Sequence, residues 1–216
     1  MLIKQRMTAN PFTVTPEHTI PQAQETMDKH GVRHLPVVED GRVVGVISAN
    51  DIAAAMPSKA TTLSAGEATY LVSKLKVGKV MSRNPITISP DALLEEAAVV
   101  MRDKKIEMLP VVQDGKLTGV ITESTILDSF IDLLGFKEHG TRLTVEAPDE
   151  LGVLARLTGI MAAHNANIQH VAVHRSGLGH SIVVIGVNTL NTEEIEAELE
   201  GDGLRVLGKL VNRHDS

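Results

Sequence analysis

The residues with the clearest chemical potential stand at positions 45–51, GVISAND. This stretch is predicted to end a strand and begin a helix, with Ser48 at the junction and Asp51 three residues later. The Ser48 hydroxyl could donate to a phosphate at the helix start, where free backbone N–H groups favour an anion. The Asp51 carboxylate could accept from two ribose hydroxyls, as acids do in dinucleotide sites. The same spacing also fits a helix capping box, so both interpretations are open at this point.

The same string returns 74 residues later as GVITEST at positions 119–125. Between residues 7–52 and 81–126, 17 of 46 pairs are identical without a gap. The second copy keeps the hydroxyl at Thr122 but has Thr125 where the first has Asp51. A repeat at a fixed offset sets the architecture, and two copies predict one unit with two pseudo-symmetric halves.

Each copy is predicted to fold as β-α-β-β-α. In the first copy, FTVT is predicted to be extended. A helix is predicted to begin at a capping box of Thr19 and Gln22 and to stop at Gly31. Asp40-Gly41 is predicted to form the turn of a hairpin. Its last helix covers 51–56 and is halted by Pro57. A polar loop and a short helix at 68–77, with Leu71 and Leu75 on one face, lead to the second copy. Its helices are predicted at 92–104 and 126–134.

The pattern changes after residue 140. Strands are predicted at 142–147, 168–174, 180–187 and 204–211, with a hairpin turn at 176–179. One helix follows Asp149 with Leu154, Leu157 and Met161 on its apolar face, and another is capped by Thr192. The order β-α-β-β-α-β is ferredoxin-like, so the fold class is α+β. The predicted boundaries are 1–56 and 78–135 for the two repeats, 57–77 for the linker between them, and 141–213 for the last domain.

Composition excludes several classes of function. The chain is 43% apolar but only 2% aromatic, with a net charge of −6 and no cysteine. Base-stacking surfaces, basic nucleic-acid faces and thiolate sites are therefore disfavoured. We expect no DNA binding, no membrane span, no signal peptide and a cytoplasmic location. His170, His174 and His180 lie near one strand edge but lack further metal ligands, and no catalytic motif is present, so we expect neither a metal nor a required cofactor.

Three motifs in the same order in both copies resemble the CBS-domain family over residues 1–134. They are NPFTVTP and NPITISP, HLPVVEDG and MLPVVQDG, and the two strings described above. The resemblance implies a regulatory pair that binds adenosine nucleotides in clefts between the repeats and forms dimers. It places the nucleotide at Thr13, Val14, Arg33, His34, Leu35, Pro36, Val46, Ser48, Asp51 and Thr122.

The resemblance also implies that the two sites are unequal. Arg33 and His34 are placed where family members reach a phosphate, although Arg33 could be a solvated charge and His34 a packing residue. Their counterparts, Glu107 and Met108, cannot neutralise an anion at neutral pH. We therefore predict one strong nucleotide site at Ser48 and Asp51 and a weaker one at Thr122.

The C-terminal part resembles an ACT domain over about residues 141–212, on the strength of PDELGVLARL and NANI. In members that bind ligands, the loop around the glycine grips an amino acid, commonly at a dimer interface. The alternative is a domain that only dimerises. The amino-acid site implied by the resemblance consists of Asp149, Leu151, Gly152, Val153, Asn167 and Ile168.

The order CBS-CBS-ACT is similar to that of the bacterial acetoin-utilisation regulatory proteins. This similarity implies a non-enzymatic sensor of AMP, ADP or ATP that acts on an unknown target protein. The alternatives are a constitutive dimerisation scaffold and, third, a stand-alone nucleotide-processing enzyme. We expect at least a homodimer, with Val77, Val80 and the helix 126–134 supplying apolar surface.

Overall fold

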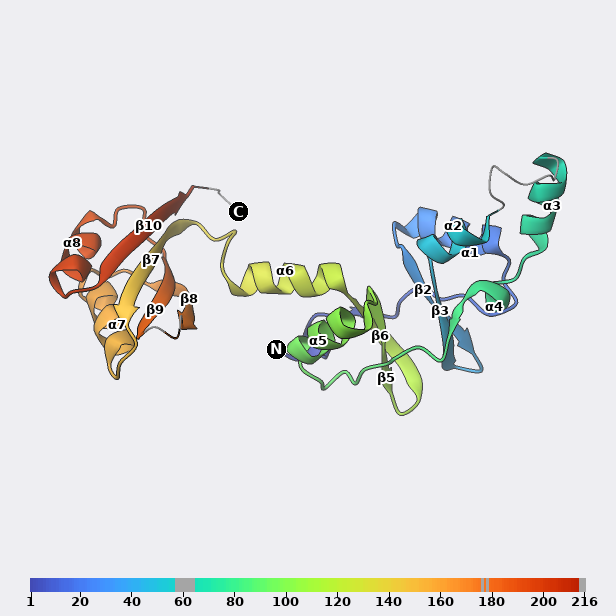
Figure 1. The fold of residues 1–216 in the computed structure, drawn as a ribbon, viewed down its shortest axis with the longest axis horizontal. Coiled ribbons are helices and arrows are strands. Elements are labelled where there is room, and N and C mark those ends of the chain that lie inside the picture. The colour runs from blue at the N-terminus through green and yellow to red at the C-terminus, as the bar shows by residue number, and fades with distance from the viewer. Residues whose placement is uncertain (57–64, 176, 178, 214–216) are drawn as a thin grey trace. The chain divides into compact units, whose positions relative to one another are not determined.

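The computed structural model describes residues 1–56, 65–175, 177 and 179–213 (Figure 1). Its contacts divide the chain into two compact units, Met1–Leu127 and Asp128–Ser216. The predicted stop at Pro57 and the loop after it lie outside the described residues, as does part of the turn predicted at 176–179. No helix in the described part of the chain is long and apolar enough to cross a membrane.

The first unit contains both repeats up to Leu127 in the last helix, and each repeat has two helices and a small sheet. The elements of the first repeat and of the segment after it are η1 (Ile3–Gln5), β1 (Thr8–Ala9), α1 (Ile20–His30), β2 (His34–Glu39), β3 (Arg42–Ser48), α2 (Ala49–Ala55), α3 (Ala65–Lys74) and α4 (Val77–Val80). Those of the second repeat are β4 (Ser82–Arg83), α5 (Leu94–Lys104), β5 (Met108–Gln113), β6 (Lys116–Thr122) and α6 (Glu123–Leu133). The extended segments predicted before α1 and α5 form isolated bridges to Val37 and Val111.

The start and end of α1 follow the predicted local chemistry. The Thr19 hydroxyl accepts from the Gln22 backbone N–H at 3.4 Å, and the Gln22 side chain accepts from the Thr19 backbone N–H at 2.8 Å. Gly31 ends the helix in the left-handed conformation, at φ 63°. A side chain there would be strained, because only glycine adopts this region freely. The predicted start and end of α1 are confirmed, whereas α2 and α6 begin at Ala49 and Glu123, before the predicted residues 51 and 126.

The residues that lead into each repeat pair with the sheet of the other repeat. β1 pairs with β6, and β4 pairs with β3, so the two sheets are ordered β1-β6-β5 and β2-β3-β4. The glycine of each repeated string makes room for this exchange. A Cβ on Gly45 would meet Sδ of Met81 at 2.5 Å, and one on Gly119 would meet Sδ of Met7 at 2.6 Å. The sequence repeat alone did not reveal this exchange.

Two predictions about the segment between the repeats are wrong in detail. The helix α3 begins before residue 68 and ends at Lys74, so Leu71 is exposed while Leu75 packs against the core after the helix end. Val77 is fully buried in the core of the first repeat. It starts the short helix α4, which packs inward, and so it cannot supply the apolar dimer surface for which it was named.

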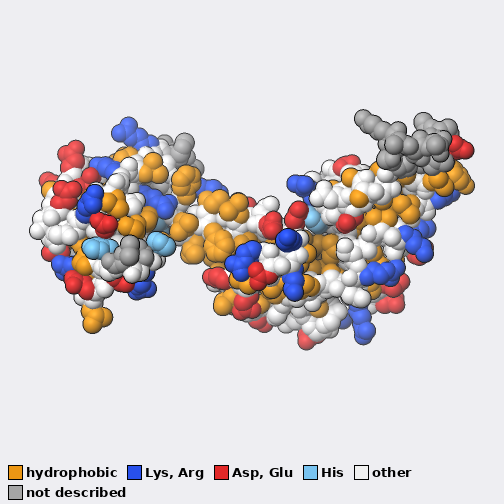
Figure 2. Space-filling model, in the orientation of Figure 1, with side chains coloured by type: hydrophobic (Ala, Val, Ile, Leu, Met, Phe, Trp, Pro, Cys, Tyr) orange, Lys and Arg blue, Asp and Glu red, His pale blue; other side chains and the backbone are white. Residues whose placement is uncertain are grey.

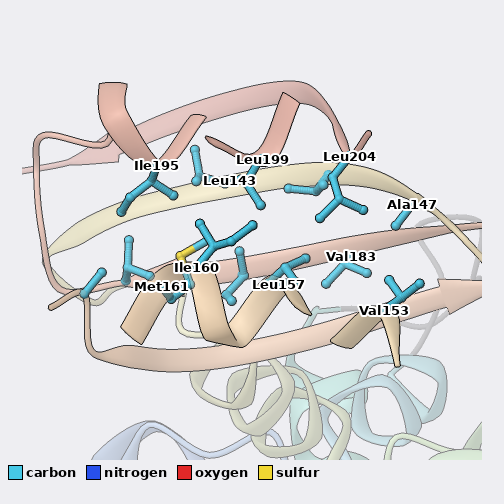
Figure 3. Packing of buried hydrophobic residues seen from close by; sticks show 14 residues of the cluster. Leu143, Ala147, Val153, Leu157, Ile160, Met161, Val183, Ile195, Leu199 and Leu204 are labelled. Carbon is cyan, nitrogen blue, oxygen red and sulfur yellow. The ribbon is translucent and has the colours of Figure 1, made fainter. Parts of the chain in front are cut away.

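The second unit is a four-stranded antiparallel sheet with two helices. Its elements are β7 (Gly140–Pro148), α7 (Val153–Ala163), β8 (Ile168–Arg175), β9 (His180–Val187), α8 (Glu193–Gly201) and β10 (Arg205–Asn212). The strand order β10-β7-β9-β8 confirms the ferredoxin-like prediction. Side chains of α7 and α8 form one apolar core with alternate residues of β7 and β9 (Figure 3).

Two details of these helices differ from the prediction. Leu157 and Met161 lie on the buried face of α7 as predicted, and Val153 and Ile160 lie there with them. Leu154, the third predicted residue, is 44% exposed. Thr192 occupies the N-cap of α8 but donates its hydroxyl to the Glu196 carboxylate at 2.6 Å rather than capping a backbone N–H.

Candidate functional site

A cleft of about 360 Å³ lies between the two repeats, within the range of small-molecule sites. One wall comes from the β3–α2 junction and from the start of β2. The other comes from the residues after β4 and from the turn between α5 and β5. The lining residues are His34, Val46, Ser48, Asn50, Asp51, Ser82, Asn84, Pro85, Ile86, Lys105, Ile106, Glu107 and Met108.

Ser48 and Asp51 form the capping box that the sequence left as an alternative. One oxygen of Asp51, Oδ2, accepts from the Ser48 backbone N–H at 2.8 Å and from the Ser48 hydroxyl at 2.7 Å. The Asp51 backbone N–H donates back to the Ser48 hydroxyl at 3.1 Å. The other oxygen, Oδ1, takes part in none of these bonds, and both residues line the cleft. The box therefore holds the carboxylate in place, and the Ser48 hydroxyl gives its proton to Asp51 and not, as the sequence suggested, to a phosphate.

The second repeat forms a neutral version of the same box. The hydroxyls of Thr122 and Thr125 lie 2.9 Å apart, and the Thr125 backbone N–H donates to the Thr122 hydroxyl at 3.3 Å. A threonine hydroxyl brings no charge, so a ribose diol there would lack the charge-assisted hydrogen bonds that Asp51 offers. Local structure is retained in both copies, and the difference between them lies in the acid.

His34 lies next to Ser48 across the β2–β3 pair and faces the second repeat. Its Nε2 atom is 3.3 Å from Oε2 of Glu107. Burial lowers the pKa of His34, and the attraction of Glu107 opposes this shift without cancelling it. The repulsion from Arg33 lowers the pKa further, while Asp51 and Glu123 raise it. The imidazole is therefore largely neutral at pH 7.

The cleft brings together four of the ten predicted nucleotide residues, His34, Val46, Ser48 and Asp51. Val14 and Leu35 are buried in the core of the first repeat, at 2% and 0% exposure, and Pro36 is buried beside them. Thr13 and Arg33 are exposed, and Thr122 belongs to the second copy of the box. These six residues do not line the cleft.

Most of the residues that sequence reasoning missed come from the second repeat, and Asn50 comes from the first. Pro85, Ile86, Ile106 and Met108 give the apolar wall, and Asn84, Lys105 and Glu107 add polar groups. Two of the quoted motifs contain several of them, in NPITISP and MLPVVQDG. The sequence leaves open whether such side chains serve the site of their own copy or of the other copy, and the structure joins the box of the first copy to the motifs of the second.

A second cavity, of about 320 Å³, lies in the second unit beside the turn that contains Gly152. Asp149, Leu151, Gly152 and Val153 of the predicted amino-acid site line it. Its other lining residues are Pro148, Glu150, Leu154, Ala155, Val173, Arg175, Ser181 and Val183. Asn167 and Ile168 are not among them. Asn167 instead receives a hydrogen bond from the Asn188 backbone, and Ile168 packs against the core.

Two features of this cavity are suited to a polar ligand. The Ser181 hydroxyl is buried and has no hydrogen-bond partner among the described residues. Arg175 at the end of β8 and Asp149 in the turn both line this cavity and form an ion pair at 3.3 Å. Gly152 is left-handed at φ 87°, but a Cβ there would meet nothing within 4 Å. The need for glycine thus comes from the backbone conformation and not from restricted access.

The three histidines near the strand edge do not form a metal site in the described part of the chain, where no group of three metal-ligating side chains occurs. His170 is instead enclosed by glycine. A Cβ on Gly135 or Gly186 would overlap its ring. Burial, followed by repulsion from Arg142, lowers the pKa of His170, and Glu138, 3.9 Å away, only partly opposes this shift.

On the face shown in Figure 2, acidic and basic side chains are interspersed over both units. Neither unit shows a continuous basic stripe on this face of the described residues. A surface of mixed charge does not favour binding to a phosphate backbone.

Comparisons with known proteins agree with the two-part organisation. The model of the CBS domain matches residues 3–58 and 77–132, and that of the ACT domain matches residues 141–203. A CBS domain-containing protein of Dictyostelium discoideum is 32% identical over 136 residues, 62% of this chain and 94% of that protein. An inosine-5′-monophosphate dehydrogenase of Korarchaeum cryptofilum is 31% identical over 209 residues, 90% of this chain but only 41% of the enzyme.

Three solved structures resemble the paired repeats. A Vibrio cholerae protein assigned to acetoin utilization (AcuB) has a TM-score of 0.53 and 30% identity, covering 63% of this chain and 94% of that one. The protein CBSX2 in complex with AMP has a TM-score of 0.51 and 30% identity, with 61% and 97% covered. The CBS domain pair of MJ0100 was solved in complex with 5′-methylthioadenosine and S-adenosylmethionine. It has a TM-score of 0.51 and 28% identity, and the match covers 64% of this chain and 98% of that one.

Proposed function

Because this chain belongs to the CBS-domain family and carries an ACT domain after its second repeat, we propose that it is a regulatory protein. We further propose that it binds an adenine nucleotide. The ligand would lie in the cleft lined by Ser48 and Asp51. Relatives of the paired repeats bind adenosine compounds, as the structures with AMP and with S-adenosylmethionine illustrate. The predicted domain boundaries, 1–56, 57–77, 78–135 and 141–213, are part of the same proposal.

The observation that carries the proposal is the position of the Asp51 carboxylate. Oδ2 is fixed by Ser48, while Oδ1 takes no part in the box, and the carboxylate lines a cleft with an apolar wall across it. An ionised oxygen in this position can accept from ribose hydroxyls, and Ile86, Ile106 and Met108 can cover the adenine. Each charge-assisted hydrogen bond contributes roughly 1.5–3 kcal/mol.

The protein would act without catalysis, as a sensor that changes the activity of a target protein. CBS and ACT domains are regulatory modules, and both match this chain, which supports such a role. The similarity to the Vibrio cholerae protein supports a role in acetoin utilisation. We further propose that the chain is at least a homodimer and that it resides in the cytoplasm.

A thermal-shift and calorimetric screen tests this function. Adenosine, AMP, ADP, ATP, 5′-methylthioadenosine and S-adenosylmethionine are each titrated into the full chain. A ligand at ~100 times its dissociation constant stabilises the folded state by roughly 2.7 kcal/mol. Asp51→Ala should weaken binding about tenfold to a hundredfold.

Thr125→Ala changes the equivalent position of the second repeat and serves as the matched control, which should leave the first site intact. Absence of binding to every compound would favour the constitutive dimerisation scaffold. Turnover of a bound nucleotide would favour the enzyme.

A second candidate function is amino-acid binding at the ACT domain. The buried, unpartnered Ser181 hydroxyl in the cavity beside Gly152 favours it. The Arg175–Asp149 pair offers one charge of each sign in the lining of the same cavity, which suits a ligand carrying a carboxylate and an ammonium. A titration with the common amino acids tests this function independently of the nucleotide.

A further inference from the structure

Glu107 is a charged group in the cleft whose effect on the ligand follows from its position. Its carboxylate lies 3.3 Å from His34, and His34 lies beside Ser48 across the β2–β3 pair. In the proposed pose the 5′ substituent lies beside Ser48, whose hydroxyl proton is already donated to Asp51. Glu107 therefore lies on the side of the cleft where a 5′ phosphate would enter.

The charges that line the cleft are unfavourable for a phosphate. Asp51 and Glu107 are acidic, whereas Lys105, which is exposed at the end of α5, is basic. His34 adds little positive charge at neutral pH, because burial lowers its pKa. Glu123 also lies close enough to act on His34. A 5′ phosphate would bring about −1.5 to −2 more charge at pH 7.

We propose that Glu107 determines ligand specificity, so that this cleft accepts adenosine compounds whose 5′ substituent is neutral or cationic and disfavours those with a 5′ phosphate. This inference rests on the proposed function of the cleft and narrows its ligands from adenine nucleotides in general to adenosine compounds without a 5′ phosphate. Like charges brought together in a binding site are strongly unfavourable, whereas an ammonium or sulfonium group would be attracted to the carboxylate. Asp51 still binds the ribose, and the apolar wall still covers the base.

The repeat supplies a matched comparison. The residue 74 positions before Glu107 is Arg33, which is exposed and does not line this cleft. The same offset relates Ser48 to Thr122 and Asp51 to Thr125. The cleft that contains the ribose acid of the first repeat is thus lined by Glu107 of the second repeat, whereas the first repeat has Arg33 at the position equivalent to Glu107.

Calorimetry with the full chain and four probes tests the inference. The probes are adenosine, 5′-methylthioadenosine, S-adenosylmethionine and AMP. The wild type should bind 5′-methylthioadenosine and S-adenosylmethionine at least about tenfold more tightly than AMP, as expected for an unfavourable like-charge contact. Glu107→Arg should reverse this preference. Glu107→Gln should reduce it, and this milder variant decides the test if Glu107→Arg fails to fold. Arg33→Gln, the control, should leave the preference unchanged.

Three results would overturn the inference. In the first, the wild type binds AMP as tightly as 5′-methylthioadenosine. In the second, the ratio of the two affinities is the same in folded Glu107→Gln as in the wild type. In either case, continued binding of adenosine leaves the proposed function standing. In the third, adenosine itself does not bind, and the proposed function fails together with this inference.

Discussion

His34 and Glu107 lie 3.3 Å apart, between Nε2 and Oε2, although one belongs to the first repeat and the other to the second. The contact joins two positions that the 74-residue offset does not pair, because Glu107 corresponds to Arg33 and His34 to Met108. The cleft therefore takes one wall from each repeat. The character of a site is set by the combination of the two copies, and neither copy determines it alone.

Installing the missing acid should create a second ribose site. Thr125 occupies the position of Asp51 in a box of the same geometry, so Thr125→Asp places a carboxylate where the Thr122 hydroxyl and backbone can hold it. Calorimetry of the full chain should then give a stoichiometry that rises from one adenosine compound per chain toward two. Thr125→Asn is the uncharged control. An unchanged stoichiometry in the folded aspartate variant would argue against the unequal-site proposal.

Adding one methyl group at Gly45 should destabilise the paired repeats. A Cβ there would lie 2.5 Å from Sδ of Met81 and 3.0 Å from the Ser82 carbonyl oxygen, in the strand supplied by the other repeat. We expect Gly45→Ala to lower the free energy of unfolding by roughly 1–3 kcal/mol, as overpacking does. Denaturant unfolding measures the change.

Gly159→Ala is the control for this variant, because the Cβ would meet nothing within 4 Å on α7. It should raise stability by roughly 0.5–1 kcal/mol. Equal effects of the two substitutions would contradict the importance of the exchanged strands.

Acid should destabilise the ACT domain through His170. Because burial lowers the pKa of His170 in the folded state, the unfolded chain takes up a proton first as pH falls below about 6.5. The free energy of unfolding therefore decreases from that pH down to the lower folded-state pKa. The loss in melting temperature between pH 7.5 and 5.5 should be smaller in His170→Gln than in the wild type.

His174→Gln controls for this effect, since His174 stands four residues along the same strand and is exposed. Its melting temperature should depend on pH as that of the wild type does. If His170→Gln lost as much stability in acid as the wild type, His170 would not be the source of the acid sensitivity.

If the ACT domain binds an amino acid, Ser181→Ala should weaken that binding about fivefold to tenfold, the value of one ordinary hydrogen bond. Nucleotide binding should not change. Gly152→Ala should abolish the amino-acid response through its backbone, because an alanine at φ 87° is strained by roughly 1–2 kcal/mol. Calorimetry that detects no amino acid bound to the wild type would favour a domain that only dimerises.

Sedimentation should show a dimer at micromolar concentration. Leu127 on α6 is 61% exposed, and a large apolar side chain in this position suits a subunit contact. Leu127→Glu should therefore shift the population toward monomer. Leu71→Glu is the control, because Leu71 is similarly exposed, at 54%, but lies outside the predicted dimer surface. This variant should not shift the population toward monomer. A monomeric wild type would remove the dimer from the proposal.

The elements of the fold could be predicted because their signals are local. Thr19, Gln22 and Gly31 define α1 through a capping box and a left-handed end, and the ferredoxin-like order follows from alternating strands and helices. The cleft could be predicted only in part. Ser48 and Asp51 form a local box, but their partners Ile86 and Glu107 arrive through tertiary contacts that a single repeat does not encode. The buried positions of Val14 and Leu35 likewise depend on sheet packing.

The exchanged strands mean that neither repeat is a complete folding unit. A single repeat without its neighbour would expose the strand edge at which the other repeat pairs, and the space beside Gly45 or Gly119 would be empty. A second repeat on another chain could fill both. Two separate chains would achieve this only at sufficient concentration, whereas the tandem chain holds its own partner at a high effective concentration. Duplication in one chain thus converts an assembly of subunits into a single folding reaction, and it frees the two halves to diverge at Asp51 and Thr125.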